Sequence, residues 1–174
     1  MKIYITGSVG SGKSTLARRV SKLIDAPCYH LDELMYIEDP TDSWGNKKRD
    51  EEERSKLFHN ILDSSCYVME DAGRECFLEG VRQADVVIIL EIPLYIRRKR
   101  ILTRWLKQKL GLERCIYKPH FGMLKAMFRW AMNYDTDADG TKSRIAPYHN
   151  KAIILRNNKE IEQYLHSFKT SYSK

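Results

Sequence analysis

The sequence has 174 residues, of which 43% are hydrophobic, and carries a formal net charge of +7. A chain of this length is expected to form one domain with a substantial core, and none of its apolar runs approaches the roughly 20 residues of a membrane-spanning helix. The first strand signal begins at the start of the sequence, so we expect no leader peptide, a cytoplasmic location and no membrane partner. Four cysteines are spread along the chain without a Cys-x-x-Cys pair, which predicts reduced thiols rather than a zinc site or a disulfide framework.

The first two predicted elements enclose a glycine-rich loop. Lys2–Thr6 reads as a buried strand, and the apolar residues from Leu16 to Ile24 recur at helical spacing. Between them, residues 7–14 read Gly-Ser-Val-Gly-Ser-Gly-Lys-Ser and fit the pattern G-x-x-x-x-G-K-[ST]. The order strand, loop, helix predicts a phosphate-binding loop at a helix N-terminus.

Such a loop binds nucleotide phosphates through backbone, charge and hydroxyl groups. Its glycines let successive backbone N–H groups turn toward one anion. Lys13 adds a positive charge for the β- and γ-phosphates, and Ser14 offers a hydroxyl to Mg²⁺. The residues expected to bind the nucleotide are Gly7, Ser8, Val9, Gly10, Ser11, Gly12, Lys13, Ser14 and Thr15.

The second predicted strand, Cys28–Leu31, ends at Asp32 beside the glycine loop. Two interpretations of Asp32 stay open: its carboxylate accepts a proton or supports a metal, or it caps a short helical segment at residues 33–36. The polar, turn-rich stretch Glu38–Lys48 is expected to be a surface loop. Asp50 then predicts the N-cap of a helix that ends near Leu62.

The third predicted strand, Cys66–Met69, stops at two acidic residues. Glu70 and Asp71 stand where phosphoryl-transfer chemistry needs a carboxylate near Mg²⁺, and the sequence does not decide between them. Arg74 follows at the start of a helix expected over Glu75–Gln83, where it would hold an acceptor phosphate.

The segment Asp85–Glu91, with an uninterrupted apolar run between its two acidic ends, predicts a fourth strand that is covered on both faces. A helix is expected over Leu94–Leu110, and its basic residues recur on one stripe. Because this stripe would leave the sheet beside the nucleotide, we expect Arg100 and Arg104 to stabilise the transferring phosphoryl group. The stripe consists of Arg97, Arg100, Arg104 and Lys107.

The rest of the chain predicts a helix at Phe121–Met132, a fifth strand at Lys151–Leu155 and a last helix at Lys159–Phe168. Five parallel strands with helical crossovers predict a three-layer αβα sandwich, with ligands at the carboxyl ends of the strands. Asn157 follows the fifth strand at that edge. Residues 112–150 are expected to form a mobile lid on this single domain.

Basic residues are concentrated between Ile92 and Tyr134, where eleven Lys or Arg accompany one acidic residue, Glu113. Such a segment suits a polyphosphate, a nucleic acid or a solvated helix face. The position of the stripe beside the glycine loop favours the nucleotide, so nucleic acid remains the less favoured partner.

Together these motifs resemble the small P-loop kinases of the adenylate kinase and shikimate kinase type. Glu70-Asp-Ala-Gly-Arg74 is similar to the Asp-Gly-x-Pro-Arg of adenylate kinases, and Arg100-Ile-Leu-Thr-Arg104 is similar to their R-I-x-x-R. The resemblance implies the fold of P-loop nucleoside triphosphate hydrolases. It further implies that Arg74 binds the acceptor, Arg100 stacks on adenine, Arg104 contacts phosphate and Asn157 lies beside the adenine.

A narrower resemblance connects the opening residues, Tyr29-His-Leu-Asp32 and Lys107-Gln-Lys-Leu-Gly111 to bacterial proteins labelled DNA topology modulation proteins. The sequence therefore predicts a monomeric or weakly dimeric ATP- and Mg²⁺-dependent phosphotransferase with a small acceptor such as a nucleoside or nucleotide. In this hypothesis Lys13, Asp32, Arg100 and Arg104 are catalytic, Asp32 and Arg74 bind the acceptor, and Ser14 with Glu70 or Asp71 binds the metal. A DNA-binding regulatory protein and a plain ATPase are the alternatives.

Overall fold

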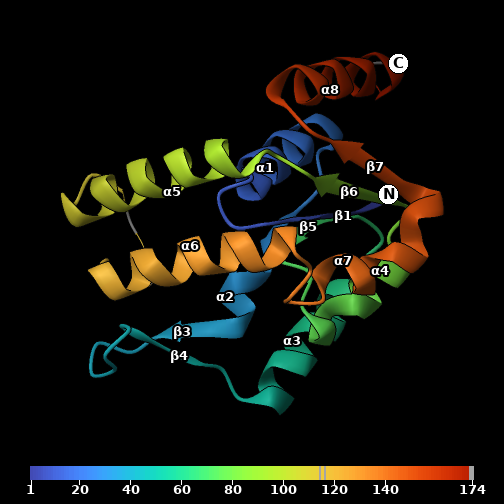
Figure 1. Ribbon diagram of the computed structural model, residues 1–174. Coiled ribbons are helices and arrows are strands. Elements are labelled where there is room, and N and C mark those ends of the chain that lie inside the picture. Colours follow the sequence, from blue (N-terminus) through green and yellow to red (C-terminus); the bar gives the residue numbers. More distant parts are fainter. Residues whose placement is uncertain (114, 116, 173–174) are drawn as a thin grey trace.

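A five-stranded parallel sheet forms the centre of the molecule (Figure 1). The computed structural model describes residues 1–113, 115 and 117–172, with side chains to residue 168. The strand order is β2-β5-β1-β6-β7, which confirms the five parallel strands expected from the sequence. The strands are β1 (Lys2–Gly7), β2 (Cys28–His30), β5 (Tyr67–Asp71), β6 (Val86–Leu90) and β7 (Ala152–Leu155).

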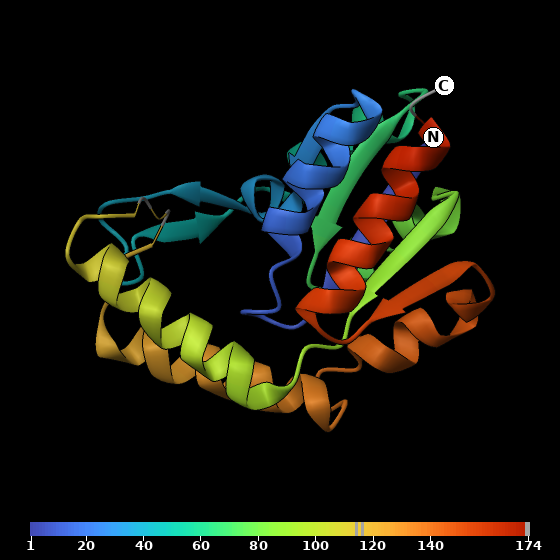
Figure 2. The same cartoon turned by 90° about the horizontal axis from the view of Figure 1, so that it is seen from above.

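Helices cover both faces of this sheet and complete three layers. The longest helices of one layer, α1 (Lys13–Ile24) and α8 (Asn158–Tyr172), lie on the same side of the sheet in Figure 2. Their apolar side chains pack on Ile3, Ile5 and Ile88. The other face is covered by α2 (Leu31–Met35), α3 (Glu51–Leu62), α4 (Leu78–Gln83), preceded by the 3-10 helix η1 (Glu75–Phe77), and α7 (Thr141–Ile145).

The strand register brings the functional segments to one edge. Thr6 at the end of β1 is paired with Asp71 at the end of β5, and Gly7 is paired with Leu90 at the end of β6. The glycine loop and the two carboxylates of β5 therefore leave the sheet side by side.

Two long helices, α5 (Leu94–Lys109) and α6 (Phe121–Asp135), pack against each other beside the glycine loop and share a third apolar cluster (Figure 2). The expected lid is built of several parts: α6, then α7 and the 3-10 helix η2 (Ala146–Lys151). Ile145 of α7 belongs to the apolar core on the sheet, whereas α6 packs against α5. The helices α6 and α7 therefore have different surroundings. Residues 114 and 116 of the expected lid lie outside the described residues. Mobility of the lid stays a prediction.

The stretch expected to be a surface loop, Glu38–Lys48, belongs to a small antiparallel hairpin of β3 (Tyr36–Glu38) and β4 (Asn46–Lys48). Its tip contacts the segment before α6, because Lys118 donates hydrogen bonds from Nζ to the carbonyls of Pro40 (2.9 Å) and Asp42 (2.8 Å). The rings of Trp44 and His120 also lie 5.1 Å apart. The hairpin and the start of α6 are therefore neighbours in space.

None of the described helices is both long and apolar enough to span a membrane.

The expected N-cap of α3 is present, since the Asp50 side chain accepts hydrogen bonds from the backbone N–H groups of Glu52 (2.9 Å) and Glu53 (3.3 Å). Asp50→Ala should lower the free energy of unfolding by about 1 kcal/mol, because it leaves these N–H groups without the side-chain acceptor. Urea denaturation of the wild type and the variant measures this loss. Asp63→Ala at the other end of the same helix is the control, and an equal loss in both variants would rule out the capping explanation.

Candidate functional site

The glycine loop turns tightly between β1 and α1. Gly10 and Gly12 have φ values of 75° and 99°, a region that favours glycine. A Cβ atom at Gly10 would lie 2.9 Å from the carbonyl oxygen of Arg97, so a larger residue does not fit there. Lys13 donates from Nζ to the carbonyl of Ser8 (3.1 Å), and the hydroxyl of Ser11 is buried without a partner among the described residues. The loop thus has the tight glycine-dependent turn of a phosphate site, with the Lys13 ammonium and the unpartnered Ser11 hydroxyl in it.

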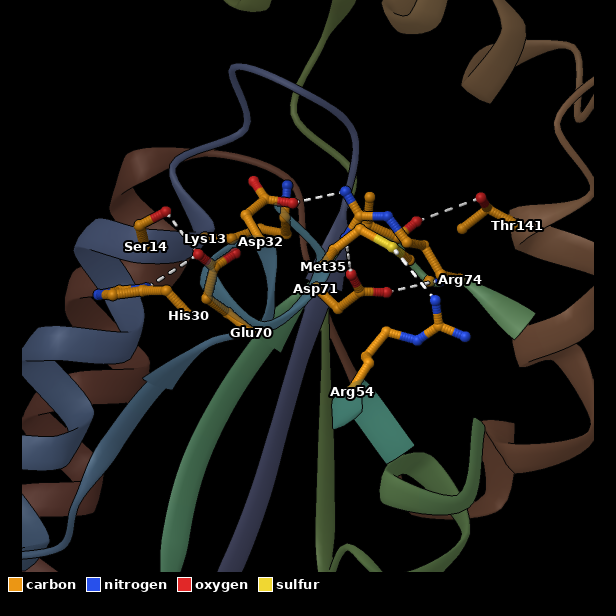
Figure 3. Close-up of polar contacts among 12 residues, drawn as sticks. Lys13, Ser14, His30, Asp32, Met35, Arg54, Glu70, Asp71, Arg74 and Thr141 are labelled. Carbon is orange, nitrogen blue, oxygen red and sulfur yellow. Dashed lines mark hydrogen bonds and ion pairs between the residues drawn. The ribbon is translucent and has the colours of Figure 1, made fainter. Parts of the chain in front are cut away.

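Glu70, at the end of β5, joins the loop to β2 (Figure 3). The residue is only 5% exposed, and its Oε1 accepts a hydrogen bond from the Ser14 hydroxyl (2.8 Å) and lies 2.9 Å from Nδ1 of His30. Burial acts to raise the pKa of Glu70, but the His30 bond, the charge of Lys13 and the Ser14 bond together lower it. Glu70 is therefore held as a carboxylate beside the hydroxyl that is expected to meet Mg²⁺.

Asp71, the next residue, serves the opposite side of the strand. Its carboxylate accepts hydrogen bonds from the backbone N–H of Arg74 (2.5 Å), from the Arg74 guanidinium and from the Tyr4 hydroxyl (3.3 Å). The guanidinium of Arg74 reaches on to Asp32 (2.5 Å), as Figure 3 shows. Although burial alone would lower the pKa of Arg74, the charges of Asp71 and Asp32 raise it above its ordinary value.

These contacts separate roles that the sequence leaves open. Glu70 contacts Ser14 whereas Asp71 contacts Arg74, so the geometry favours Glu70 over Asp71 as the metal-supporting carboxylate. The capping interpretation of Asp32 is wrong, because α2 begins at Leu31 with His30 as its N-cap residue and Asp32 lies in the first turn. The Asp32 side chain is 59% exposed and paired with Arg74.

Arg100 lies directly against the glycine loop. Its guanidinium donates to the carbonyl of Ser11 (2.7 Å) and to Oδ1 of Asn158 (2.9 Å). A hollow of about 370 Å³ beside it is bordered by the loop, α1, α5 and the start of α8, including Gly12, Thr15 and Ile161. The hollow has room for the part of a nucleotide that extends beyond the phosphates.

The other residues of the predicted nucleotide site have partners of their own. Arg104 donates from Nε to Glu113 (3.0 Å). Asn157 accepts from the backbone N–H of Glu160 (2.9 Å), and thereby caps α8, while its neighbour Asn158 contacts Arg100. The expectation of one cationic stripe on α5 is wrong for Arg97, which is buried.

Sequence reasoning missed two guanidinium groups on the face of the sheet toward which Asp71 points. Arg54 of α3 has a side chain only 13% exposed, with Nη1 3.9 Å from the Met35 sulfur and Nη2 3.5 Å from Glu51. Arg144 of α7 donates from Nε to the carbonyl of Gly73 (3.1 Å). Each stands in a segment with several charged neighbours, so no motif distinguishes it. His30 was also missed, since the five histidines show no ligand spacing.

The His30–Glu70 pair predicts a pH dependence of stability. The hydrogen bond to Glu70 raises the pKa of His30 above its ordinary value of 6.5, despite the opposing effect of burial. A raised histidine pKa stabilises the fold at low pH, and this stabilisation is lost as the pH rises through the folded-state value. Melting temperatures measured from about pH 6 to about pH 8.5 should therefore fall more in the wild type than in His30→Asn. His149→Asn is the control, and an unchanged slope in His30→Asn would contradict the pairing.

Solved structures of other proteins share the fold of this chain. A shikimate kinase from Bacteroides thetaiotaomicron is 15% identical, with a TM-score of 0.52 over 100% of this chain and 99% of that chain. A shikimate kinase from Acinetobacter baumannii in complex with shikimate is 16% identical, with a TM-score of 0.53 over 99% and 95%. A sugar kinase from Janibacter is 13% identical, with a TM-score of 0.52 over 98% and 90%. At these identities the likeness shows a shared fold, and it confirms the fold expected of a P-loop protein.

A comparison with curated proteins gives no match. A match to a protein family covers residues 3–114, which contain the glycine loop, both carboxylates of β5 and Arg100. Because this match covers more than half of the sequence, the chain belongs to the AAA domain family.

Proposed function

We propose that the chain is an ATP- and Mg²⁺-dependent phosphotransferase that moves the γ-phosphoryl group of ATP to a small acceptor. One observation carries the proposal: two consecutive carboxylates at the end of β5 serve different partners. Glu70 contacts Ser14 of the glycine loop, and Asp71 contacts Arg74, which in turn contacts Asp32. A phosphoryl donor site and a charged acceptor site thus share one strand end.

On the donor side, the glycine loop would hold the phosphates through its N–H groups and Lys13. Arg100 lies against the loop, so its charge is close to where the phosphates would bind. The hollow beside Arg100 would take the base and ribose. Arg104 is paired with Glu113, so its guanidinium would have to leave this carboxylate to reach the nucleotide.

Ser14 and Glu70 suit a Mg²⁺ ion that is bound mainly by phosphate oxygens. Mg²⁺ prefers oxygen ligands and is commonly held by one or two protein groups together with the phosphates of its substrate. The Ser14 hydroxyl fits as a ligand, and Glu70 fits as the carboxylate that orients it. When bound, the ion would neutralise phosphate charge. His30 holds Glu70 in place from the other side.

On the acceptor side, Asp32 is exposed enough to meet a substrate and is paired with Arg74. Its carboxylate would take the proton of the acceptor hydroxyl as the hydroxyl oxygen bonds to the γ-phosphorus, and ADP would leave. Arg54, Arg74 and Arg144 surround this region and favour an acceptor that carries a phosphate or carboxylate as well as a hydroxyl.

The two alternatives have less support from the contacts. In a plain ATPase, where water is the acceptor, the Asp32–Arg74 pair would have no substrate to hold. A nucleic-acid-binding protein would use exposed cations of α5 and α6 such as Arg98, Lys107 and Arg129. Arg100, whose guanidinium donates to the glycine loop, favours the nucleotide instead. The resemblance to DNA topology modulation proteins therefore stays a prediction of sequence relationship, and it predicts no reaction.

An ATP-consumption screen over nucleosides, nucleoside monophosphates and anionic hydroxyl metabolites tests the proposal. At least one compound should raise turnover above the rate with water alone, and Lys13→Ala should lower that turnover by about 100-fold or more, because it removes the charge nearest the migrating phosphoryl group. Lys22→Ala, an exposed lysine on the same helix, is the matched control.

Two results would contradict the proposal. One is that no compound exceeds the water-only rate, and the other is that Lys13→Ala behaves like Lys22→Ala. Affinity for duplex DNA that falls steeply with salt, without turnover of any small acceptor, would favour the nucleic-acid alternative.

A further inference from the structure

Arg97, in the first turn of α5, is the most deeply buried cation of the part of the chain that the structure describes, with 1% of its surface exposed. Its guanidinium joins three separate segments. It donates to the carbonyl of Ile92 (2.7 Å), to the hydroxyl of Ser8 in the glycine loop (2.5 Å) and to the carbonyl of Ala131 (2.9 Å). It also forms an ion pair with Asp135 at the end of α6.

A buried guanidinium is stable only when its donors have partners. For Arg97 most of these partners belong to α6, because Ala131, Asp135 and the ring of Tyr134, 5.7 Å away, all lie in its last two turns. The positive charge also lies at the negative end of the α6 dipole. If α6 moved away, the bonded partners left to Arg97 among the described residues would be Ser8 and Ile92.

The same pair of helices touches the glycine loop at two further points. Val9 packs into the apolar cluster shared by α5 and α6, next to residues such as Ile101 and Met127. The backbone of α5 approaches Gly10 so closely that a Cβ there would lie 2.9 Å from the Arg97 carbonyl. The first half of the loop, Ser8 to Gly10, is therefore shaped by α5 and α6 as well as by β1 and α1.

We propose that Arg97 is a positioning residue that makes the conformation of the glycine loop depend on the docking of α6. Its burial prevents contact with a nucleotide, unlike Arg100, so it acts through Ser8. Undocking of α6 would release the Ser8 hydroxyl and loosen the loop, and phosphate bound to the loop would in turn favour docked α6. This inference rests on the proposed nucleotide site for its functional meaning, but the physical link between α6 and the loop is testable without nucleotide.

The test uses variants at the two ends of the link, because a change at buried Arg97 itself could unfold the protein. Asp135 is 38% exposed at its side chain, so Asp135→Asn should fold. We would compare the wild type, Asp135→Asn, Ser8→Ala, the double variant, and Asp63→Asn as an exposed control at the residue that follows α3. Two readouts are needed: hydrogen exchange of the loop amides without nucleotide, and the Kd for ATP.

Asp135→Asn should speed exchange of the loop amides by about threefold or more, while Asp63→Asn leaves exchange unchanged. Asp135→Asn should weaken ATP binding about fivefold in the wild-type background but less than about twofold in the Ser8→Ala background, because Ser8 transmits the effect. Loop exchange equal to that of Asp63→Asn, or equal effects on ATP binding in both backgrounds, would overturn the inference. If the wild type binds no ATP, the proposed function fails, and the exchange result alone decides the inference.

Discussion

The site depends on one geometrical constraint, the alternation of side chains along β5. Successive residues of a strand point to opposite faces of the sheet, so Glu70 and Asp71 cannot serve the same partner. Both carboxylates are buried, and a buried carboxylate is costly unless it has hydrogen-bond or charged partners. Glu70 is hydrogen-bonded to Ser14 and His30, and Asp71 is hydrogen-bonded to Arg74 and Tyr4. The alternation thus divides one sheet edge into the proposed nucleotide side and the proposed acceptor side.

Each side is completed by segments that are distant in sequence. The nucleotide side combines the loop after β1 with Arg100 of α5 and Asn158 of α8. The acceptor side combines Asp32 of α2, Arg54 of α3 and Arg144 of α7 around the turn at residues 71–74. Gly73 belongs to this turn for a steric reason, since a Cβ there would lie 2.6 Å from the Thr141 side chain. Phosphoryl transfer needs little covalent chemistry from a protein, so an arrangement that brings two charged sites together provides most of what the reaction requires.

The sequence predicted well what is encoded locally. The glycine loop, the five strands, the α3 cap at Asp50 and the position of Arg74 at a helix start all depend on short-range patterns. It predicted poorly what depends on packing between distant segments. Helical periodicity assigned Arg97 to the same stripe as Arg104, but only the position of α6 shows that Arg97 is covered. Arg54 and Arg144 belong to no motif, and the contact of Lys118 with the hairpin tip joins segments that are distant in sequence. Asp32 was expected at the end of a strand, but it lies in the first turn of α2, and its partner Arg74 was not identified.

The central claim is that Glu70 and Asp71 serve different halves of the site. Equilibrium binding of ATP, measured with and without Mg²⁺ in the wild type, Glu70→Gln and Asp71→Asn, tests it most directly. Mg²⁺ should strengthen ATP binding in the wild type. That gain should fall by about tenfold in Glu70→Gln and remain in Asp71→Asn, because only Glu70 orients the expected metal ligand Ser14. Equal loss of the Mg²⁺ effect in both variants, or its loss in Asp71→Asn alone, would contradict the division of roles.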